Sequence, residues 1–379
     1  MAANTLTRGR LRRLADVHPD RGRVLSVFLN LDPAEFATPA ARSSAITSVM
    51  TEAARRVEEA ADLEHDELQD LRADVERVRE VLNGDVASNG TRAVAVFACA
   101  SAGLLEVVAL REPLDSRVVL NDSPYVEPLV HAGGAERWCV VLCNRRAARL
   151  FVGRGAELEE TDRIEDDVHR QHDQGGWSQS RYQRGVDKEV EDHLGHVART
   201  AFDQFKLRGF DRLLVGGPEE TIGDLEAKLH PYLKDRLVGR VSCDVENSSL
   251  DAVRASAGQK ITDFARGRER GALDRMAQGV GSGGRGAGGL AEVLAALNEA
   301  RVEILLVGPG MTAAGVCDPA TGLLYATPEE VPDGATAVPV DDIVEKAIEK
   351  AIEQSAEVIG IRHHDDLGPV GGIGAVLRY

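Results

Sequence analysis

The sequence predicts a mixed α/β protein made of three consecutive domains. Apolar runs of strand length alternate with longer amphipathic segments of helical period along most of the 379 residues. A proline-rich stretch and the glycine-rich run Gly279–Gly289 interrupt this alternation. From these breaks we expect domains over residues 1–134, 135–278 and 279–379. With 43% hydrophobic residues, the chain is long enough for each domain to have its own core.

The composition of the chain argues against several classes of protein. The formal net charge of −17 argues against a protein that coats nucleic acid, because phosphate binding needs clustered Lys and Arg. No run approaches about 18 consecutive apolar residues, and Met1–Pro19 lacks the apolar core of a signal peptide, so we expect a cytoplasmic protein with no membrane segment. The five cysteines, an odd number in mostly strand-like runs, suggest reduced core thiols. Arginine-rich segments at 7–23 and 264–275 are either solvated helix faces or local RNA contacts.

The first domain reads as a sheet with one long helical region. Residues 40–82 are charged and helical in period, with a break near residues 62–65. A turn at Ala102-Gly103 joins two of the apolar runs as a hairpin. The predicted strands are Val24–Leu31, Arg92–Cys99, Leu104–Leu110 and Arg117–Leu120.

The second domain opens with a predicted hairpin and continues as alternating helices and strands. Cys139 and Cys143 lie at i and i+4 of the first strand, about 13 Å apart, which is too far for both to bind one metal ion. The predicted strands are Trp138–Leu142, Ala147–Gly153, Arg212–Val215 and Val238–Val245, and the predicted helices are Val186–Arg208, Glu219–Leu237 and Ser248–Arg270.

The third domain follows the glycine-rich run. We interpret Gly279–Gly289 as a flexible linker rather than a phosphate-binding loop, because no apolar strand immediately precedes it. The sequence after this run predicts helices at Leu290–Ala300 and Asp341–Gln354 and strands at Val302–Val307 and Glu357–Ile361. It ends in the glycine-rich segment Gly371–Tyr379.

The stretch His172–Arg184 combines polar side chains and paired glycines in one loop more densely than any other part of the sequence. Its paired glycines, Gly175 and Gly176, can enter backbone conformations closed to other residues, so the loop can approach a substrate closely. The apolar period of Val186–Arg208 places this loop at the N-terminal end of a long amphipathic helix. That end favours anions such as phosphate.

This loop and helix resemble the central domain of the archaeo-eukaryotic class I translation release factors, where a Gly-Gly-Gln loop leads into a helix. The terminal Gly371–Tyr379 is similar to the Gly-Gly-Ile-Gly-x-x-Leu-Arg-Tyr signature of the same family's third domain, which has the fold of kink-turn-binding ribosomal proteins. The resemblance extends to the bacterial branch of this superfamily and to peptidyl-tRNA hydrolases of ribosome quality control. Trp177 occupies the position of the family's catalytic glutamine, and the nearest glutamine in the loop is Gln179. The stop-codon-reading motifs of the family's first domain are absent from this sequence.

The resemblance implies a ribosome-associated protein that hydrolyses the ester of peptidyl-tRNA in translation rescue or quality control. Backbone N–H groups and a glutamine amide would orient water and support the oxyanion, at roughly 10²- to 10³-fold in rate for each donor. The alternative is a non-hydrolysing factor that occupies the ribosomal A site, as in hibernation or on stalled ribosomes. The implied catalytic residues are Gly175, Gly176 and Gln179, and the implied RNA-binding residues are Trp177, Ser178, Arg181, Tyr182 and Arg184.

The expected partners are the ribosome, its RNA, peptidyl-tRNA and an elongation-type GTPase, with no cofactor and no metal. Two histidine and acidic runs, residues 165–173 and 363–366, could ligate a divalent ion, but we interpret them as solvated loops because they lack a defined frame of ligands.

Overall fold

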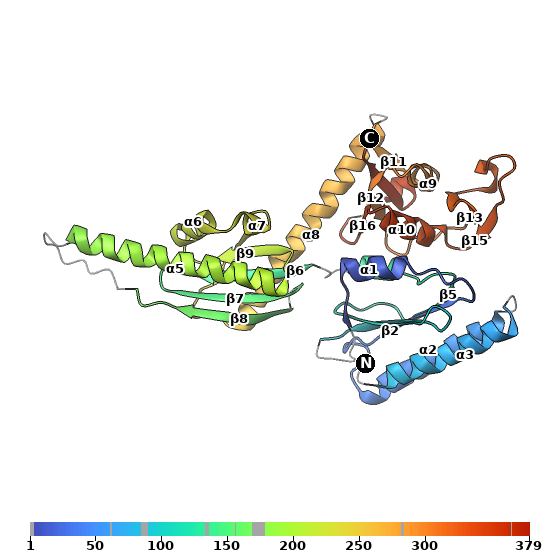
Figure 1. Ribbon diagram of the computed structural model, residues 1–379, viewed down its shortest axis with the longest axis horizontal. Helices are drawn as coiled ribbons and strands as arrows, with labels where there is room; N and C mark the ends of the chain where they lie inside the picture. The colour runs from blue at the N-terminus through green and yellow to red at the C-terminus, as the bar shows by residue number, and fades with distance from the viewer. Residues whose placement is uncertain are drawn as a thin grey trace. The chain divides into compact units, whose positions relative to one another are not determined.

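The computed structural model describes residues 4–60, 63–84, 90–132, 136–155, 157–168, 179–281, 284–364 and 366–379. Four sheets with flanking helices confirm the mixed α/β class (Figure 1). The chain divides into two compact units: residues 1–133 with 268–379, and residues 134–267. No helix among the described ranges is long and apolar enough to cross a membrane.

The N-terminal part of the first unit is a five-stranded sheet with strand order β1-β4-β3-β2-β5. Its apolar strands confirm the predicted ones, and the predicted helical break separates α2 from α3. Thr38 starts α2 by accepting a hydrogen bond from the Ala41 amide at 3.2 Å. The helices α2 and α3 pack one face of the sheet through a buried cluster that includes Met50 and Val78. The elements are β1 Asn4–Thr5, α1 Arg8–Ala15, β2 Val24–Asn30, α2 Pro39–Glu59, α3 His65–Asn83, β3 Ala93–Cys99, β4 Leu104–Leu110, β5 Arg117–Asn121 and α4 Glu127–His131.

The C-terminal part of the same unit is a four-stranded sheet of order β11-β17-β12-β16. A small three-stranded sheet of order β14-β13-β15 is formed by the residues between β12 and α10. The predicted helices and strands of this part are present, while the small sheet was not predicted. The elements are β11 Gly286–Gly288, α9 Leu290–Asn298, β12 Val302–Val307, β13 Gly315–Asp318, β14 Leu323–Tyr325, β15 Val338–Val340, α10 Ile343–Glu353, β16 Glu357–Gly360 and β17 Ile373–Leu377.

The glycine-rich run 279–289 is not a linker over its described residues, so that prediction was wrong. Its residues 286–288 form β11, which pairs antiparallel with β17. A Cβ added to Gly279 would lie 2.4 Å from the Gly286 nitrogen. The glycines are therefore needed because two backbone segments approach each other closely, which no larger residue would allow.

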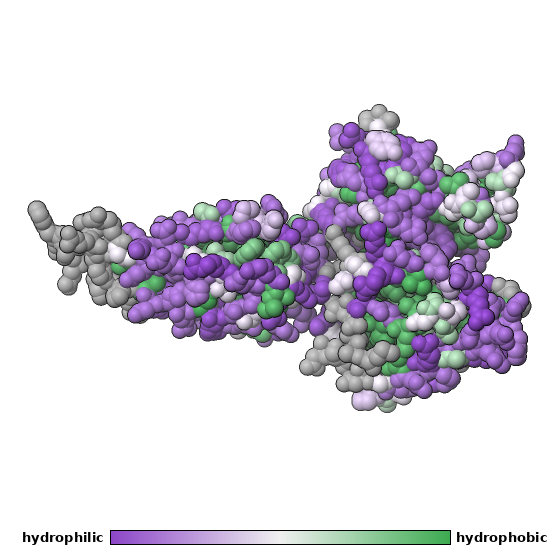
Figure 2. All heavy atoms as spheres, viewed as in Figure 1, coloured by the Kyte–Doolittle hydropathy of each residue, from purple (hydrophilic) through white to green (hydrophobic). Residues whose placement is uncertain are grey.

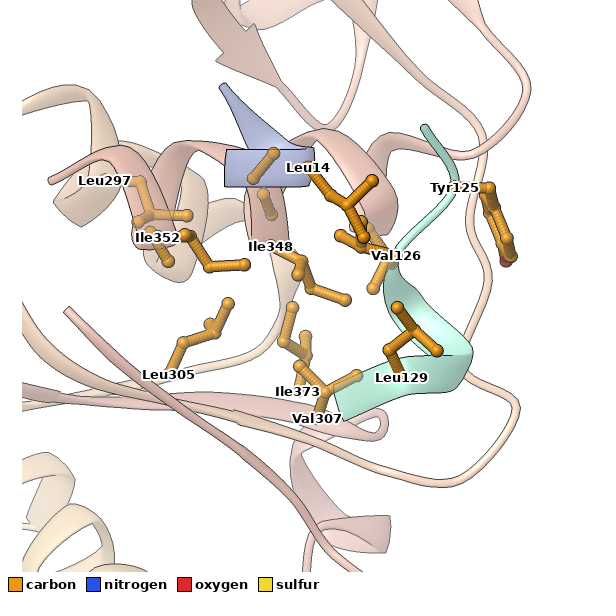
Figure 3. Packing of buried hydrophobic residues seen from close by; sticks show 14 of the residues in the cluster. Leu14, Tyr125, Val126, Leu129, Leu297, Leu305, Val307, Ile348, Ile352 and Ile373 are labelled. Atoms are coloured by element: carbon orange, nitrogen blue, oxygen red, sulfur yellow. The ribbon is translucent and has the colours of Figure 1, made fainter. Parts of the chain in front are cut away.

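One hydrophobic core joins the first and last parts of the chain. Figure 3 shows Leu14, Tyr125 and Leu129 from the N-terminal part with Ile348 and Ile373 from the C-terminal part. All five belong to a single buried cluster. The three-domain division at residues 134 and 278 stays a prediction, but the outer two segments form one compact unit rather than two.

The second unit is a five-stranded sheet of order β10-β9-β6-β7-β8, in which β6, β9 and β10 are parallel. The helices α5 and α6 supply the buried core on one face, and α8 supplies it on the other. The elements are β6 Arg137–Cys143, β7 Ala147–Arg154, β8 Glu157–Glu165, α5 Gln179–Arg208, β9 Arg212–Gly216, α6 Glu219–Lys228, α7 Pro231–Lys234, β10 Leu237–Val241 and α8 Leu250–Gly281.

Three features of this unit differ from prediction. The strand β8 was missed because most of its residues are charged or polar. The predicted helix 219–237 breaks before Pro231 into α6 and α7, because proline has no N–H to continue the helical hydrogen bonds. The helix α5 begins at Gln179 rather than at Val186.

Candidate functional site

The predicted site loop falls largely outside the described residues. Gly175, Gly176, Trp177 and Ser178 all lie in the stretch 169–178, which the structure does not describe. The remaining predicted residues, Gln179, Arg181, Tyr182 and Arg184, lie in the first turns of α5. The backbone of Gln179 is therefore helical, whereas the sequence predicted it in the loop.

The segment that enters this loop is fastened to α5 through Asp166. Its carboxylate lies 2.6 Å from His193 Nδ1 and 3.1 Å from His196 Nδ1. The His193 side chain is 0% exposed, so this contact is part of the packed interior. The Asp166 amide also donates to the Arg146 carbonyl at 2.9 Å. Asp166 thus fixes where the chain leaves the sheet and which turn of α5 it meets.

The charge of Asp166 is favoured by these histidines. Burial raises the pKa of this carboxyl group, but hydrogen bonds from His193 and His196 and their attraction outweigh burial, so the pKa lies below its ordinary value. The anion is the acceptor that both imidazoles need. The contact of Asp166 with His193 and His196 was not predicted from the sequence. Two histidines at i and i+3 inside an apolar helix period nevertheless indicate a buried polar partner.

Cys143, His193 and Asp166 form a row that superficially matches a nucleophilic triad. The Cys143 sulfur lies 3.8 Å from His193 Nε2, on the side of the ring opposite Asp166. However, the thiol is fully buried, and burial raises its pKa to about 12. A reactive cysteine needs an accessible thiolate, so this row is structural and holds Asp166 against α5 rather than attacking a substrate.

The β6–β7 turn forms the neighbouring part of the same sheet edge. Asn144 Oδ1 accepts hydrogen bonds from the amides of Arg146 and Ala147 at 2.9 and 2.8 Å. Glu246 accepts from Arg146 Nη2 at 2.9 Å and from Asn144 Nδ2 at 3.2 Å. These bonds hold the turn in one shape, so the carbonyl of Arg146 is in place to receive Asp166.

A pocket of about 550 Å³ opens at the carboxyl ends of β6 and β9, beside the first turn of α6. It combines two guanidinium groups with three carboxylates, so its charge does not select an anion. The lining residues are Asn144, Arg145, Arg146, Val190, Pro218, Glu219, Glu220, Thr221 and Asp224. Gly217, next to the lining residue Pro218, has φ of 143°, and an added Cβ there would lie 2.0 Å from the Cys143 carbonyl oxygen.

The C-terminal signature has a structural role in the first unit. Gly371 and Gly372 have φ of 69° and 86°, which side chains rarely tolerate. The Arg378 guanidinium donates to the carbonyls of Ala300 at 3.3 Å and Gln354 at 3.0 Å. These carbonyls follow α9 and α10, so one arginine caps the C-terminal ends of both helices.

Metal ligation receives no support from the described ranges. Across the chain outside the undescribed gaps, no three His, Cys, Asp or Glu side chains are placed to hold an ion. His363, in one of the two predicted acidic loops, instead pairs with the buried Glu269 at 2.8 Å. The other predicted run continues into residues 169–173, which lie outside the described residues.

Comparison with known proteins points to translation factors. A family model described as bacterial archaeo-eukaryotic release factor family 10 matches residues 124–261. Peptide chain release factor subunit 1 of Methanopyrus kandleri is 29% identical over 213 residues, which cover 53% of this chain and 51% of that protein. The corresponding protein of Thermoplasma acidophilum is 26% identical over 270 residues, or 64% of each chain. The chain thus spans about half the length of the first relative and about two thirds of the second.

Solved structures give a more distant similarity. The archaeal translation termination factor aRF1 is 15% identical over 99% of each chain, with a TM-score of 0.27. Yeast Dom34, described as a translation termination-like factor that interacts with Hbs1, is 10% identical over 76% of this chain and 79% of that one, with a TM-score of 0.41. The sequence matches confirm the resemblance to the archaeo-eukaryotic release factors that the motifs indicated.

Proposed function

We propose that this chain, a relative of the archaeo-eukaryotic class I release factors in their bacterial branch, is a ribosome-associated translation factor that enters the A site. The observation that carries the proposal is the family match over residues 124–261, which include the loop and most of the second unit. The expected partners are the ribosome, ribosomal RNA, peptidyl-tRNA and an elongation-type GTPase. Such a protein works in the cytoplasm.

Within this function, we assign hydrolysis of the peptidyl-tRNA ester to the loop and the start of α5. Gly175 and Gly176 would give the loop its close approach, and Gln179 would orient water at the first turn of the helix. The first N–H groups of an α-helix have no partner within the helix and favour developing negative charge. The fixed contacts of Asp166 support this proposal because they hold the entry to the loop in one position.

RNA contacts are assigned to the same segment. Arg181 and Arg184 lie in the first turns of α5. They would bind phosphates near the loop, while Trp177 would stack on an exposed base and Ser178 and Tyr182 would add hydrogen bonds.

A second candidate function is occupancy of the A site without hydrolysis. Two observations favour it: Trp177 stands where the family has glutamine, and Gln179 is part of a helix rather than of the loop. A catalytic amide displaced by two residues moves several Å, and reacting groups tolerate little error in position. Under this candidate, the protein binds ribosomes as the first candidate does but releases no peptide.

Both candidates require binding to the A site, which co-sedimentation with purified ribosomes tests. We expect the chain to pellet with ribosomes whose A site is empty and to be excluded when that site is filled with aminoacyl-tRNA. Equal pelleting with empty and filled A sites would contradict the proposed binding site. Release of peptide then separates the two candidates.

A further inference from the structure

The second unit carries a ladder of aromatic rings that starts in its core and ends at its surface. Phe205 meets the buried Phe210 edge to face, with ring centres 5.3 Å apart, and lies 6.1 Å from Phe202. The Phe202 ring stacks on His230 at 4.1 Å, and His230 is 5.0 Å from Tyr232. The ladder joins the C-terminal turns of α5 to the start of α7.

The outer end of this ladder is open to solvent. Tyr232 is 58% exposed, and Leu207, in the last turn of α5, is 75% exposed. Both are among the few large hydrophobic residues that the described surface leaves exposed. Figure 2 shows hydrophobic residues, in green, interrupting the hydrophilic surface along the α5 side of this unit.

Two of the rings carry a cation on their face. Lys206 Nζ lies 5.0 Å from the centre of the Phe202 ring, and Arg236 Cζ lies 4.5 Å from that of Phe205. Arg236 also donates to the carbonyls of Tyr232 at 2.7 Å and Phe210 at 3.2 Å. Arg236 therefore joins α7 to Phe205 and Phe210, and these contacts fix the position of the Tyr232 backbone.

The local charge opposes the charge of the whole chain. The segments 199–208 and 228–236 contain the cations Arg199, Lys206, Arg208, Lys228, Lys234 and Arg236 and the acids Asp203 and Asp235, which is six positive against two negative groups, or +4. Lys228 is paired with Glu191, which lies outside these segments, at 3.0 Å, so the local surplus is about +3. The whole chain has a net charge of −17. Asp203 pairs with Lys206 at 2.6 Å, but both groups are more than half exposed, so this pair is readily exchanged for a phosphate.

We propose that this surface, which we call the aromatic ladder face (Phe202, Lys206, Leu207, His230, Tyr232 and Lys234), binds an unpaired segment of ribosomal RNA. An unpaired nucleotide has a flat base, which can stack on an exposed aromatic ring, and a phosphate, which a neighbouring Lys or Arg can neutralise. An exposed ring with cations beside it can therefore bind both parts of the nucleotide. The positive charge of the face is complementary to RNA. The choice of ribosomal RNA as the source rests on the proposed function.

This face is separate from the loop. It lies at the C-terminal end of α5, whereas the loop precedes the N-terminal end, and α5 has 30 residues, a length of about 45 Å. The protein would therefore hold ribosomal RNA at one end of α5 while the loop occupies the other. Such a second contact would fix the direction of the helix on the ribosome.

The test measures binding of a labelled, unstructured oligoribonucleotide of about 12 nucleotides by fluorescence anisotropy, using the full chain. We expect Tyr232→Ala to weaken binding by about 10-fold, because one stacked base is lost, and Tyr232→Phe to retain it. Lys206→Glu should also weaken binding and make it less sensitive to salt.

The chain offers matched controls for both substitutions. Tyr379 is 67% exposed and has Arg301 5.8 Å from its ring centre, so Tyr379→Ala removes a similar aromatic and cation pair from the first unit. Lys260→Glu changes an exposed lysine elsewhere in the second unit by the same charge. Both variants should bind RNA as the unaltered chain does. Because Tyr232 and Lys206 are exposed, the test variants should keep their thermal stability.

The outcomes separate this inference from the proposed function. If Tyr232→Ala lowers both RNA affinity and ribosome pelleting, the face binds ribosomal RNA. If Tyr232→Ala and Tyr379→Ala bind the oligonucleotide and ribosomes equally well, the inference is overturned while the proposed function stands. If the oligonucleotide binds through the face but no ribosome pellets, the face binds RNA and the ribosomal source is wrong.

Discussion

Asp166 holds the segment that follows β8 against α5. It accepts from two histidines of α5 at a point three residues before the undescribed stretch begins. A carboxylate that bonds two imidazoles and sits at the edge of the core contributes more than an exposed ion pair, because water competes less for it. The loop entry is thus held by charge and hydrogen bonding rather than by apolar packing.

We predict that Asp166→Asn destabilises the second unit by about 1 kcal/mol at neutral pH, since the amide accepts more weakly than the anion. The pKa of this carboxyl group is lower in the folded state than in the unfolded chain, so its contribution is fully present above the unfolded value of about 4. It is lost as the pH falls through the folded value. Thermal denaturation of both proteins from pH 7 to pH 3 measures this.

Asp167→Asn provides the matched control, because Asp167 is the exposed neighbour in the same segment. We expect its denaturation temperature to follow that of the unaltered chain at every pH. A constant difference between Asp166→Asn and the unaltered chain down to pH 3 would refute the charged contact.

Among the elements, α10 shows how a helix can bury an acidic side chain and still be stable. Glu345 is fully buried, yet its two carboxylate oxygens accept from the amides of Val126 and Glu127, which begin α4. Burial and the nearby Glu349 raise the pKa of Glu345 well above its ordinary value. The side chain thus serves as the N-terminal cap of another helix and joins α4 to α10.

We predict that Glu345→Ala lowers the free energy of unfolding of the first unit by about 2–3 kcal/mol, because two buried N–H groups lose their acceptor. Glu353→Ala is the control, since Glu353 lies on the exposed side of the same helix. It should change stability by less than about 0.5 kcal/mol. Urea denaturation of the two variants measures the difference, and equal stabilities would show that the cap contributes nothing.

Most elements could be predicted from period and turn residues, and the exceptions have physical reasons. The strand β8 lacks an apolar alternation, because its residues run Glu-Leu-Glu-Glu-Thr-Asp-Arg-Ile-Glu and only Leu158 and Ile164 are buried. The glycines of 279–289 look like a linker until their close backbone contacts are seen. Likewise, the pairing of Asp166 with His193 joins residues 27 apart, and only the fold brings them together.

For the candidate site, the sequence was enough for the family resemblance, whereas the site residues themselves stay a prediction. The residue types of the loop and the C-terminal signature were enough for the resemblance. The start of α5 at Gln179 could not be predicted, because Arg181-Tyr182-Gln183 has no apolar period and Gly185 argues against helix. The aromatic ladder was equally hidden, since its rings come from α5, from the turn after it and from the start of α7.

At the scale of the whole molecule, the first and last parts of the chain fold as one unit although the second unit separates them in sequence. Their shared core contains Leu14 of α1 and Ile348 of α10 (Figure 3). Because contacts that far apart in sequence form late and cost chain entropy, neither part should be stable without the other.

We therefore predict that Ile348→Ala costs about 2–4 kcal/mol and raises amide hydrogen exchange in both α1 and β12. Val338→Ala is the control, because Val338 is 44% exposed and lies outside this core. Hydrogen exchange followed by mass spectrometry measures the exchange rates of α1 and β12 in one experiment. Faster exchange in β12 alone would contradict the shared core.

We propose that the loop before α5 hydrolyses peptidyl-tRNA, and the decisive measurement is release of labelled peptide from ribosomes with peptidyl-tRNA in the P site. We expect release by the unaltered chain and a loss of roughly 10²-fold in rate for Gln179→Ala and Gly176→Ala, with ribosome pelleting unchanged. Pelleting without release by the unaltered chain would contradict hydrolysis and leave the A-site occupancy factor. Absence of both pelleting and release would contradict the ribosomal function itself.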